Sequence, residues 1–382
     1  MTRITALVLV ALLAAGCAQA IKENPVAKIK RDGGKVWIED VPELRWGADR
    51  ECTYAGALAA ALSVTAHPVS YDDIMGLSGL AFRVRWWISA TEPGKRQWCP
   101  STPVGEFPEE VAATQARTGW HLFTEGRMDR EKDPHMEDLA PDIRAAIDAG
   151  WPAAVYPTPE NLNVGVIYGY QDGGKTWLVR DYFAQDGTTL VPIEKLGPMV
   201  LVPREFKPAL PRRQALIECL KMAAAHGSRG KGPGEKGPYF YGKAAIEQWS
   251  KDIGLADDPA AALTPKEREG LFFLGWWNFG QWADARAAAV RFLARAGEEL
   301  GGDARGALKR AADQYRQQAE LLASCFGRQD AFFGPWTGKK IEDWTPEVRK
   351  REREILAEAV RFETAAVAEI QKALQELGTQ SR

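Results

Sequence analysis

Cys52 is the residue whose type and position could carry the most chemistry in this chain. It stands at the start of a predicted helix of small, apolar residues that runs to about Val64. The unpaired N–H groups at a helix start carry partial positive charge and favour ionisation of a thiol placed there. Because the thiolate is the reactive form of cysteine, this position suits a nucleophile. The alternative is a small buried hydrophobic side chain with no chemical role.

A second stretch, from Asn163 to Asp181, has the pattern of an antiparallel hairpin with a turn at Gly173-Gly174. Its strands are Asn163-Val164-Gly165-Val166-Ile167-Tyr168-Gly169-Tyr170 and Trp177-Leu178-Val179-Arg180-Asp181. Together with the Cys52 helix, this hairpin resembles the second half of papain-like cysteine enzymes. Within that superfamily it is most similar to the bacteriocin-processing peptidase type.

The resemblance implies roles for three residues. In the family, a His six residues before the strand glycine takes the proton of the cysteine, and an acid on the next strand orients the ring. Counting back from Gly169 reaches Asn163, and Asp181 follows 18 residues later at the position of the acid. The implied catalytic group is therefore Cys52, Asn163 and Asp181. An amide cannot accept the proton at neutral pH, so the position where the family has its catalytic base holds a residue that cannot act as one.

The layout from Cys52 to Phe326 also resembles the family of butirosin biosynthesis protein H, an acyltransferase with a papain-like N-terminal domain. Proteins of that group often continue into a helical domain, and the stretch Ala311–Leu322 here is similar to theirs. The resemblance implies an α+β domain in which the cysteine helix packs on an antiparallel sheet, followed by an all-α helical bundle.

Other parts of a cysteine-enzyme site are also missing or displaced. The chain has four histidines, His67, His121, His135 and His226, and none has the expected position. The stretch Leu44 to Glu51, directly before Cys52, contains no Gln to build the usual oxyanion hole, although the Cys52 backbone N–H could still donate. These departures argue against ordinary cysteine proteolysis.

One formal motif points elsewhere. Residues Gly169 to Thr176 fit the phosphate-loop pattern G-x-x-x-x-G-K-[ST]. Such a loop binds phosphate only where a helix begins at its Lys-Thr end. Here the following residues alternate as a strand does, so we predict a hairpin turn and no nucleotide site.

The N-terminus has the features of an export signal. Arg3 precedes an apolar run, Ile4 to Ala15, that is too short to span a membrane. The run ends Leu13-Ala14-Ala15-Gly16-Cys17, which resembles the lipobox of bacterial lipoproteins. This implies lipidation of Cys17 and anchoring of the exported protein to a lipid bilayer, the outer membrane in a diderm organism. The alternative is an ordinary signal peptide cleaved after Ala18 or Ala20.

The remaining chain divides by pattern. We predict a lipoprotein signal peptide and lipobox (1–17), a tether (18–39), the papain-like α+β domain (40–205), a helix with a Gly-rich linker (206–240) and a helical domain (241–382). The predicted strands are Lys35–Ile38, Leu80–Ser89, Trp120–Thr124, Pro152–Tyr156, Asn163–Tyr170, Thr176–Phe183 and Met199–Val202. The predicted later helices are Pro211–His226, Tyr241–Gly254, Pro265–Leu300 as one or two, Asp303–Phe326 and Pro346–Leu377.

Composition limits the functions that remain. A net charge of −2 gives no indication of a nucleic-acid surface, and no ligand spacing typical of a metal site occurs, so we expect no cofactor. Cys52, Cys99, Cys219 and Cys325 allow three disulfide pairings, of which Cys219–Cys325 is one. Three hypotheses follow: a degenerate papain-like module that binds a peptide, amide or acyl ligand, an active thiol-dependent acyltransferase or amide hydrolase, and a structural lipoprotein. The first is slightly favoured by the absent base.

Overall fold

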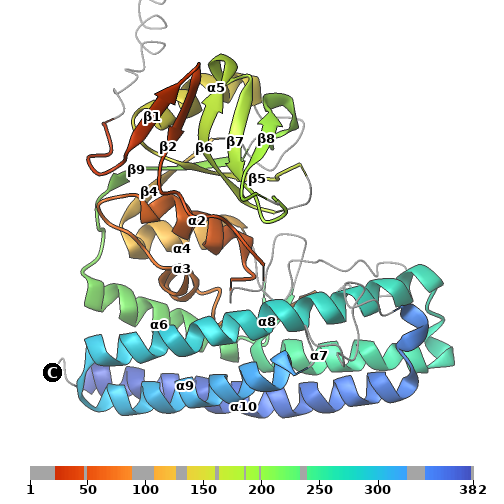
Figure 1. Cartoon of the computed structure of the whole chain (residues 1–382). Helices are drawn as coiled ribbons and strands as arrows, with labels where there is room; N and C mark the ends of the chain where they lie inside the picture. Colours follow the sequence, from red (N-terminus) through yellow and green to blue (C-terminus); the bar gives the residue numbers. More distant parts are fainter. Residues whose placement is uncertain are drawn as a thin grey trace, which may run out of the picture.

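The protein combines a curled antiparallel sheet with a helical C-terminal region (Figure 1). This computed structural model describes residues 22–46, 50–87, 107–125, 136–159, 163–184, 186–197, 199–232, 239–324 and 340–379. The sheet lies at one end of the molecule, the short helices α2, α3 and α4 form the middle, and the long helices form the other end. No helix among these residues is long and apolar enough to cross a membrane.

The large sheet has eight strands in the order β1-β2-β6-β5-β9-β4, with β7 paired to β6 and β8 paired to β7. β6 therefore has three neighbours, and its register is irregular between Ile167 and Gly169. A Cβ atom on Gly169 would lie 2.5 Å from the carbonyl oxygen of Val36, so only glycine lets β2 approach there. The strands are β1 (Ile29–Asp32), β2 (Lys35–Ile38), β4 (Trp120–Glu125), β5 (Ala153–Tyr156), β6 (Gly165–Gln171), β7 (Thr176–Arg180), β8 (Thr189–Pro192) and β9 (Met199–Phe206).

Four helices accompany this sheet. They are α2 (Thr53–Ser63), α3 (Tyr71–Ser78), α4 (Phe107–Thr118) and α5 (Met136–Asp148). α2 packs against β5 and β6 and α5 against β2, β5, β6 and β9. The side chain of Ser70 accepts a hydrogen bond from the Asp73 backbone and caps α3, and Gly79 ends it in the left-handed conformation at φ +90°. The two caps therefore define where α3 begins and ends, and α3 packs against α2 on one side and α8 on the other.

The C-terminal region is built from α6 (Arg212–Ser228), α7 (Gly242–Gly254), α8 (Pro265–Leu300), α9 (Gly302–Ala323) and α10 (Pro346–Thr379). Thr264 and Glu267 form a capping box with Pro265 at the first helical position, which starts α8 sharply. A second sheet joins β10 (Lys231–Gly232) and β11 (Tyr239–Tyr241) to β3 (Arg85–Trp87). Strand pairing thus connects the helical region to the segment that follows α3.

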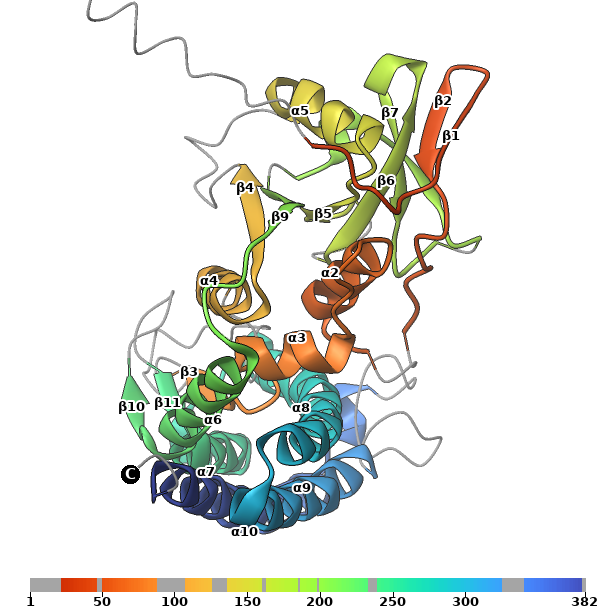
Figure 2. The same ribbon diagram turned by 90° about the vertical axis from the view of Figure 1, so that its left-hand side faces the viewer.

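One hydrophobic cluster extends from the sheet through α2, α3 and α4 into α8, α9 and α10. A second cluster surrounds Trp86, Trp249 and Trp282 where α7 packs on the first half of α8. Within the first cluster α3 packs against both α2 and α8, and Figure 2 shows α3 between these two helices.

Most predicted elements are confirmed, and the differences have physical causes. The strand predicted over Leu80–Ser89 begins later than expected, because Leu80 to Val84 are buried irregular chain and the described residues that pair are Arg85–Trp87; Ile88 and Ser89 lie outside the described residues. The predicted Gly-rich spacer contains β10, and the predicted tether contains β1 and β2. Alternation is weak in β1 and β10, so pattern alone does not identify them, whereas β2 matches the predicted strand Lys35–Ile38.

Candidate functional site

Cys52 lies where the prediction placed it, at the N-cap of α2. Its backbone is extended (φ −82°, ψ 101°), and its carbonyl accepts the first helical hydrogen bond from Gly56 at 2.9 Å. The rest of α2 is almost wholly buried, because alanines and glycine let it sit close to β5 and β6. Cys52 itself is only partly buried and is a thiol rather than half of a disulfide.

The hairpin brings Asn163 and Asp181 to the start of this helix. The N–H of Val164, next to Asn163, donates to the side-chain oxygen of Thr53, next to Cys52, at 3.2 Å. β6 and β7 pair Val166 with Arg180, and continuing this register places Asn163 and Asp181 on one face at the same end of the hairpin. The register therefore puts Asn163 and Asp181 at the same end of the hairpin, and the Val164–Thr53 bond puts Asn163 beside the start of α2.

Asp181 is almost fully buried at 1% exposure. One of its carboxylate oxygens accepts a hydrogen bond from the Phe183 N–H at 2.9 Å. The other oxygen is buried and accepts no hydrogen bond from the described residues. Asn163 is also buried, and its backbone carbonyl accepts from the N–H of Thr158 at 3.0 Å. The position that would orient an imidazole thus retains an unused acceptor.

A hydrogen-bonded chain that the sequence did not predict reaches Cys52 from the helical region. The backbone N–H of Cys52 donates to the Tyr71 hydroxyl at 3.1 Å, and that hydroxyl donates to a carboxyl oxygen of Asp284. Tyr71 is the first residue of α3, and Asp284 lies in the middle of α8 (Figure 2). The expectation that the Cys52 N–H could serve as an oxyanion donor is corrected, because Tyr71 already occupies it.

Burial dominates the electrostatics of this chain. It raises the pKa of the Asp284 carboxyl to about 7, against a favourable hydrogen bond from Tyr71. It also raises the pKa of the Tyr71 hydroxyl well above its ordinary value, with the Asp284 charge and Cys52 adding to the effect. The second carboxyl oxygen of Asp284 accepts no hydrogen bond of ordinary geometry from the described residues. Cys52 thus shares its surroundings with an acid and a phenol.

Tyr182, directly after Asp181, closes the other side of the site. Its hydroxyl lies so near α2 that a Cβ atom on Gly56 would be 1.9 Å away. Its ring centroid is 4.6 Å from that of Trp46, and Phe183 also contacts Trp46. A pocket of about 120 Å³ opens beside Tyr182 and is lined by Glu43, Leu44, Arg45, Arg50, Gly56, Ala60 and Tyr182.

The described histidines have other roles. His67 stacks on Phe206 with ring centroids 3.8 Å apart, and His121 is exposed on β4 at one end of the sheet order. Burial, reinforced by the charges of Arg83 and other arginines, lowers the pKa of His226 at the end of α6 to about 3. His135 lies outside the described residues. A histidine substitute for Asn163 is therefore not seen within the described part of the chain.

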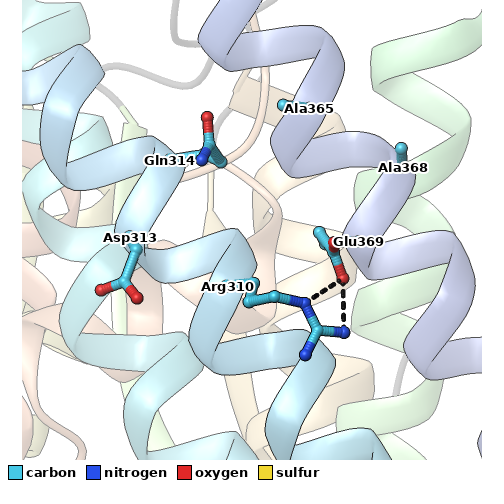
Figure 3. Close-up of a pocket in the computed structure, with 6 residues that line it drawn as sticks. All are labelled: Arg310, Asp313, Gln314, Ala365, Ala368 and Glu369. Atoms are coloured by element: carbon cyan, nitrogen blue, oxygen red, sulfur yellow. Dashed lines mark hydrogen bonds and ion pairs between the residues drawn. The ribbon is translucent and has the colours of Figure 1, made fainter.

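A larger cavity, about 390 Å³, lies between α9 and α10, far along the sequence from this chemistry. Figure 3 shows Arg310 and Glu369 bonded to each other across it, with an N–O distance of 2.8 Å, and Ala365 and Ala368 beside them. Its charged side chains are already paired, Arg310 with Glu369 and Asp313 with Arg316. We therefore place the candidate site at Cys52 despite the smaller volume.

The structure describes some of the predicted cysteines and the whole of the phosphate-loop motif. Cys219 is a buried thiol that donates to the Gly76 carbonyl at 2.9 Å, which excludes the Cys219–Cys325 pairing in this structure. The Gly169–Thr176 motif forms the predicted hairpin, with Gln171 opposite Thr176. Cys17, Cys99 and Cys325 lie outside the described residues. No group of three potential metal-ligating side chains occurs within the described ranges.

Sequence reasoning missed Tyr71, Tyr182 and Asp284. The available signal was Asp284 itself, a charged residue inside the apolar segment Trp282-Ala283-Asp284-Ala285 of a buried helix. Buried carboxyls are rare unless paired, so such a residue marks a specific contact. No family model matches the chain, and no curated protein matches it.

Proposed function

We propose that this chain is a lipid-anchored exported protein whose papain-like α+β region binds a peptide, amide or acyl ligand beside Cys52 without turning it over. One observation carries the proposal. The Cys52 N–H, the oxyanion donor that a papain-like enzyme needs, is occupied by Tyr71. Asn163 at the position of the base supports the same conclusion, since its amide cannot accept the thiol proton.

The ligand class follows from the resemblance and from the surface around Cys52. The partly buried thiol lies beside Tyr182, which packs against Trp46, and Phe183 is 41% exposed nearby. Aromatic side chains with a polar end provide large contact area at modest entropic cost in binding sites. A cleft that keeps its cysteine helix and its acid but lacks a base retains the means to bind a carbonyl compound.

Alkylation tests this function. We expect iodoacetamide to modify Cys52 in the folded protein, located by peptide mass spectrometry, while buried Cys219 reacts only after unfolding. We expect no Cys52-dependent hydrolysis of p-nitrophenyl acetate or of peptide substrates, with Cys52→Ser as the control. Reaction of Cys52 only after unfolding would instead support the structural hypothesis.

Asn163→His tests the geometry independently. An imidazole at this position has the unused oxygen of Asp181 as its acceptor, and it would supply the absent base. We expect the variant to gain Cys52-dependent hydrolysis of p-nitrophenyl acetate, and Asn163→Gln to gain none. A folded Asn163→His protein with no gain would contradict the papain-like assignment of these positions.

The active thiol-dependent acyltransferase or amide hydrolase is the second candidate, and one observation favours it. Asp284 is a buried carboxyl near Cys52 with its pKa raised to about 7, which suits a proton acceptor at neutral pH. On this alternative Asp284 would accept the Cys52 proton. Turnover by the wild type that Asp284→Asn abolishes would establish it in place of the binding function.

A further inference from the structure

The pocket beside Tyr182 follows the same face of α2 as Cys52. Gly56 and Ala60 stand four and eight residues after Cys52, so they lie one and two turns along that face. The Tyr182 hydroxyl lies against Gly56, and the pocket is lined by Gly56, Ala60 and Tyr182. Because helical side chains lean toward the N-terminus, the surface over Gly56 adjoins Cys52.

The Tyr182 hydroxyl is the polar group inside this pocket. Tyr182 is 6% exposed, yet its hydroxyl forms no hydrogen bond with the described residues. Burial raises the pKa of this phenol, so the hydroxyl stays protonated and can donate. The hydroxyl is accessible from the pocket, where a ligand oxygen can accept its hydrogen bond.

Arg50 supplies the positive charge of the pocket lining. Arg45 also lines the pocket, but its guanidinium donates to Glu43 at 3.0 Å and is neutralised there. Arg50 is exposed and forms no ion pair within the described ranges. Glu51 and Asp284 lie close enough to influence Tyr182, but neither lines the pocket. Among the lining residues that the structure describes, Arg50 is therefore the cation without an ion pair.

We propose that this pocket is a subsite for the carboxylate end of a short ligand, held by the Tyr182 hydroxyl and the Arg50 guanidinium. The inference rests on the proposed binding function and names the ligand chemistry at that site. A volume of about 120 Å³ corresponds to roughly four water molecules, so only a small terminal group fits. Terminal carboxylates are recognised in this way by a hydrogen-bond donor together with a cation.

Protection of Cys52 from iodoacetamide measures occupancy of this site. The probes are N-acetyl-trialanine as the free acid and as the C-terminal carboxamide, which differ only in the terminal charge. We expect the acid to protect Cys52 at about fivefold lower concentration than the amide, the size of effect that an exposed cation gives. Arg50→Gln should abolish this preference, and Arg45→Gln, the matched control, should retain it.

Three results would overturn the inference, and they distinguish its failure from failure of the proposed function. Equal protection by acid and amide would leave the binding function in place and remove the carboxylate subsite. A preference that survives in Arg50→Gln would show that another group selects the acid. Protection by neither probe would also overturn the subsite, and Asn163→His would then test the papain-like cleft on its own.

Discussion

At the scale of single residues, Asp284 is the buried carboxyl that is linked to Cys52 through the Tyr71 hydroxyl. Its pKa is about 7 in the folded protein and near 3.8 in the unfolded chain, because burial disfavours the ionised form. As pH rises through this range the unfolded chain releases its proton first. The free energy of unfolding therefore falls, by up to about 4 kcal/mol between acid pH and about pH 8.

Asp284→Asn should remove this pH-dependent fall in the free energy of unfolding, because an amide does not ionise. Relative to wild type, the variant should gain stability steadily between about pH 4 and about pH 8, as urea unfolding at several pH values would measure. It should also alkylate faster at Cys52 near neutral pH, because a negative charge close to a thiol opposes its ionisation. The amide can still accept the Tyr71 hydrogen bond, so the local geometry is kept.

Glu352 provides the control for Asp284→Asn. It is a buried carboxyl in α10 whose pKa burial raises to about 8, and it accepts a hydrogen bond from the Trp344 indole at 2.8 Å. Glu352→Gln should change the pH dependence of stability in the same direction but leave Cys52 alkylation unaltered. If both variants or neither changed alkylation, the link from Asp284 to Cys52 would be contradicted.

The site could be predicted only where its signals are local in the sequence. Cys52 at a helix start and the hairpin ending in Asp181 each follow from a short stretch, and the structure places both as expected. The bond between Tyr71 and Asp284 joins residues 213 positions apart. No periodicity or motif encodes that separation, since it depends on how α3 and α8 pack.

At the scale of elements, α8 holds the two halves of the molecule together through Arg286. This fully buried guanidinium donates to the Ala81 carbonyl after α3, to Gln318 in α9 and to Glu363 in α10, with distances of 2.6, 2.7 and 2.7 Å. The pattern of α8 predicted one or two helices, because apolar residues continue through its whole length. It is one helix, and its buried charges show where neighbours meet.

Arg286→Met should destabilise the protein by about 3–5 kcal/mol, because Glu363 and the Ala81 carbonyl would then be buried without their donor. Adding Glu363→Gln should recover part of that loss. Urea unfolding measures both. The exposed pair Arg310–Glu369 between α9 and α10 is the control, and Arg310→Met should cost less than about 1 kcal/mol. Equal effects of the two arginine variants would contradict the role of Arg286.

At the scale of the whole molecule, the proposed lipid anchor on Cys17 would determine which end of the protein faces a membrane. Asn24 is buried and donates to the carbonyls of Val64 and Gly150, both at 2.9 Å, so the chain is fixed seven residues after Cys17. Seven extended residues span at most roughly 25 Å. If Cys17 carries lipid, the sheet lies near the bilayer and α9 lies at the far end of the molecule (Figure 1).

Cys17→Ser should therefore release the protein from the membrane fraction, whereas wild type stays with it until detergent is added.

The orientation of the anchored protein can be measured separately, in a Cys52→Ser background. A fluorophore on Lys30→Cys in β1 should be quenched by spin-labelled lipid, and a fluorophore on Lys309→Cys in α9 should not. Both positions are exposed, but Lys30 lies in the sheet and Lys309 in the helical region. Membrane association that survives Cys17→Ser would refute the lipid anchor. Equal quenching at both positions would refute the orientation, because an anchor this short cannot let the helical end approach the bilayer as closely as the sheet.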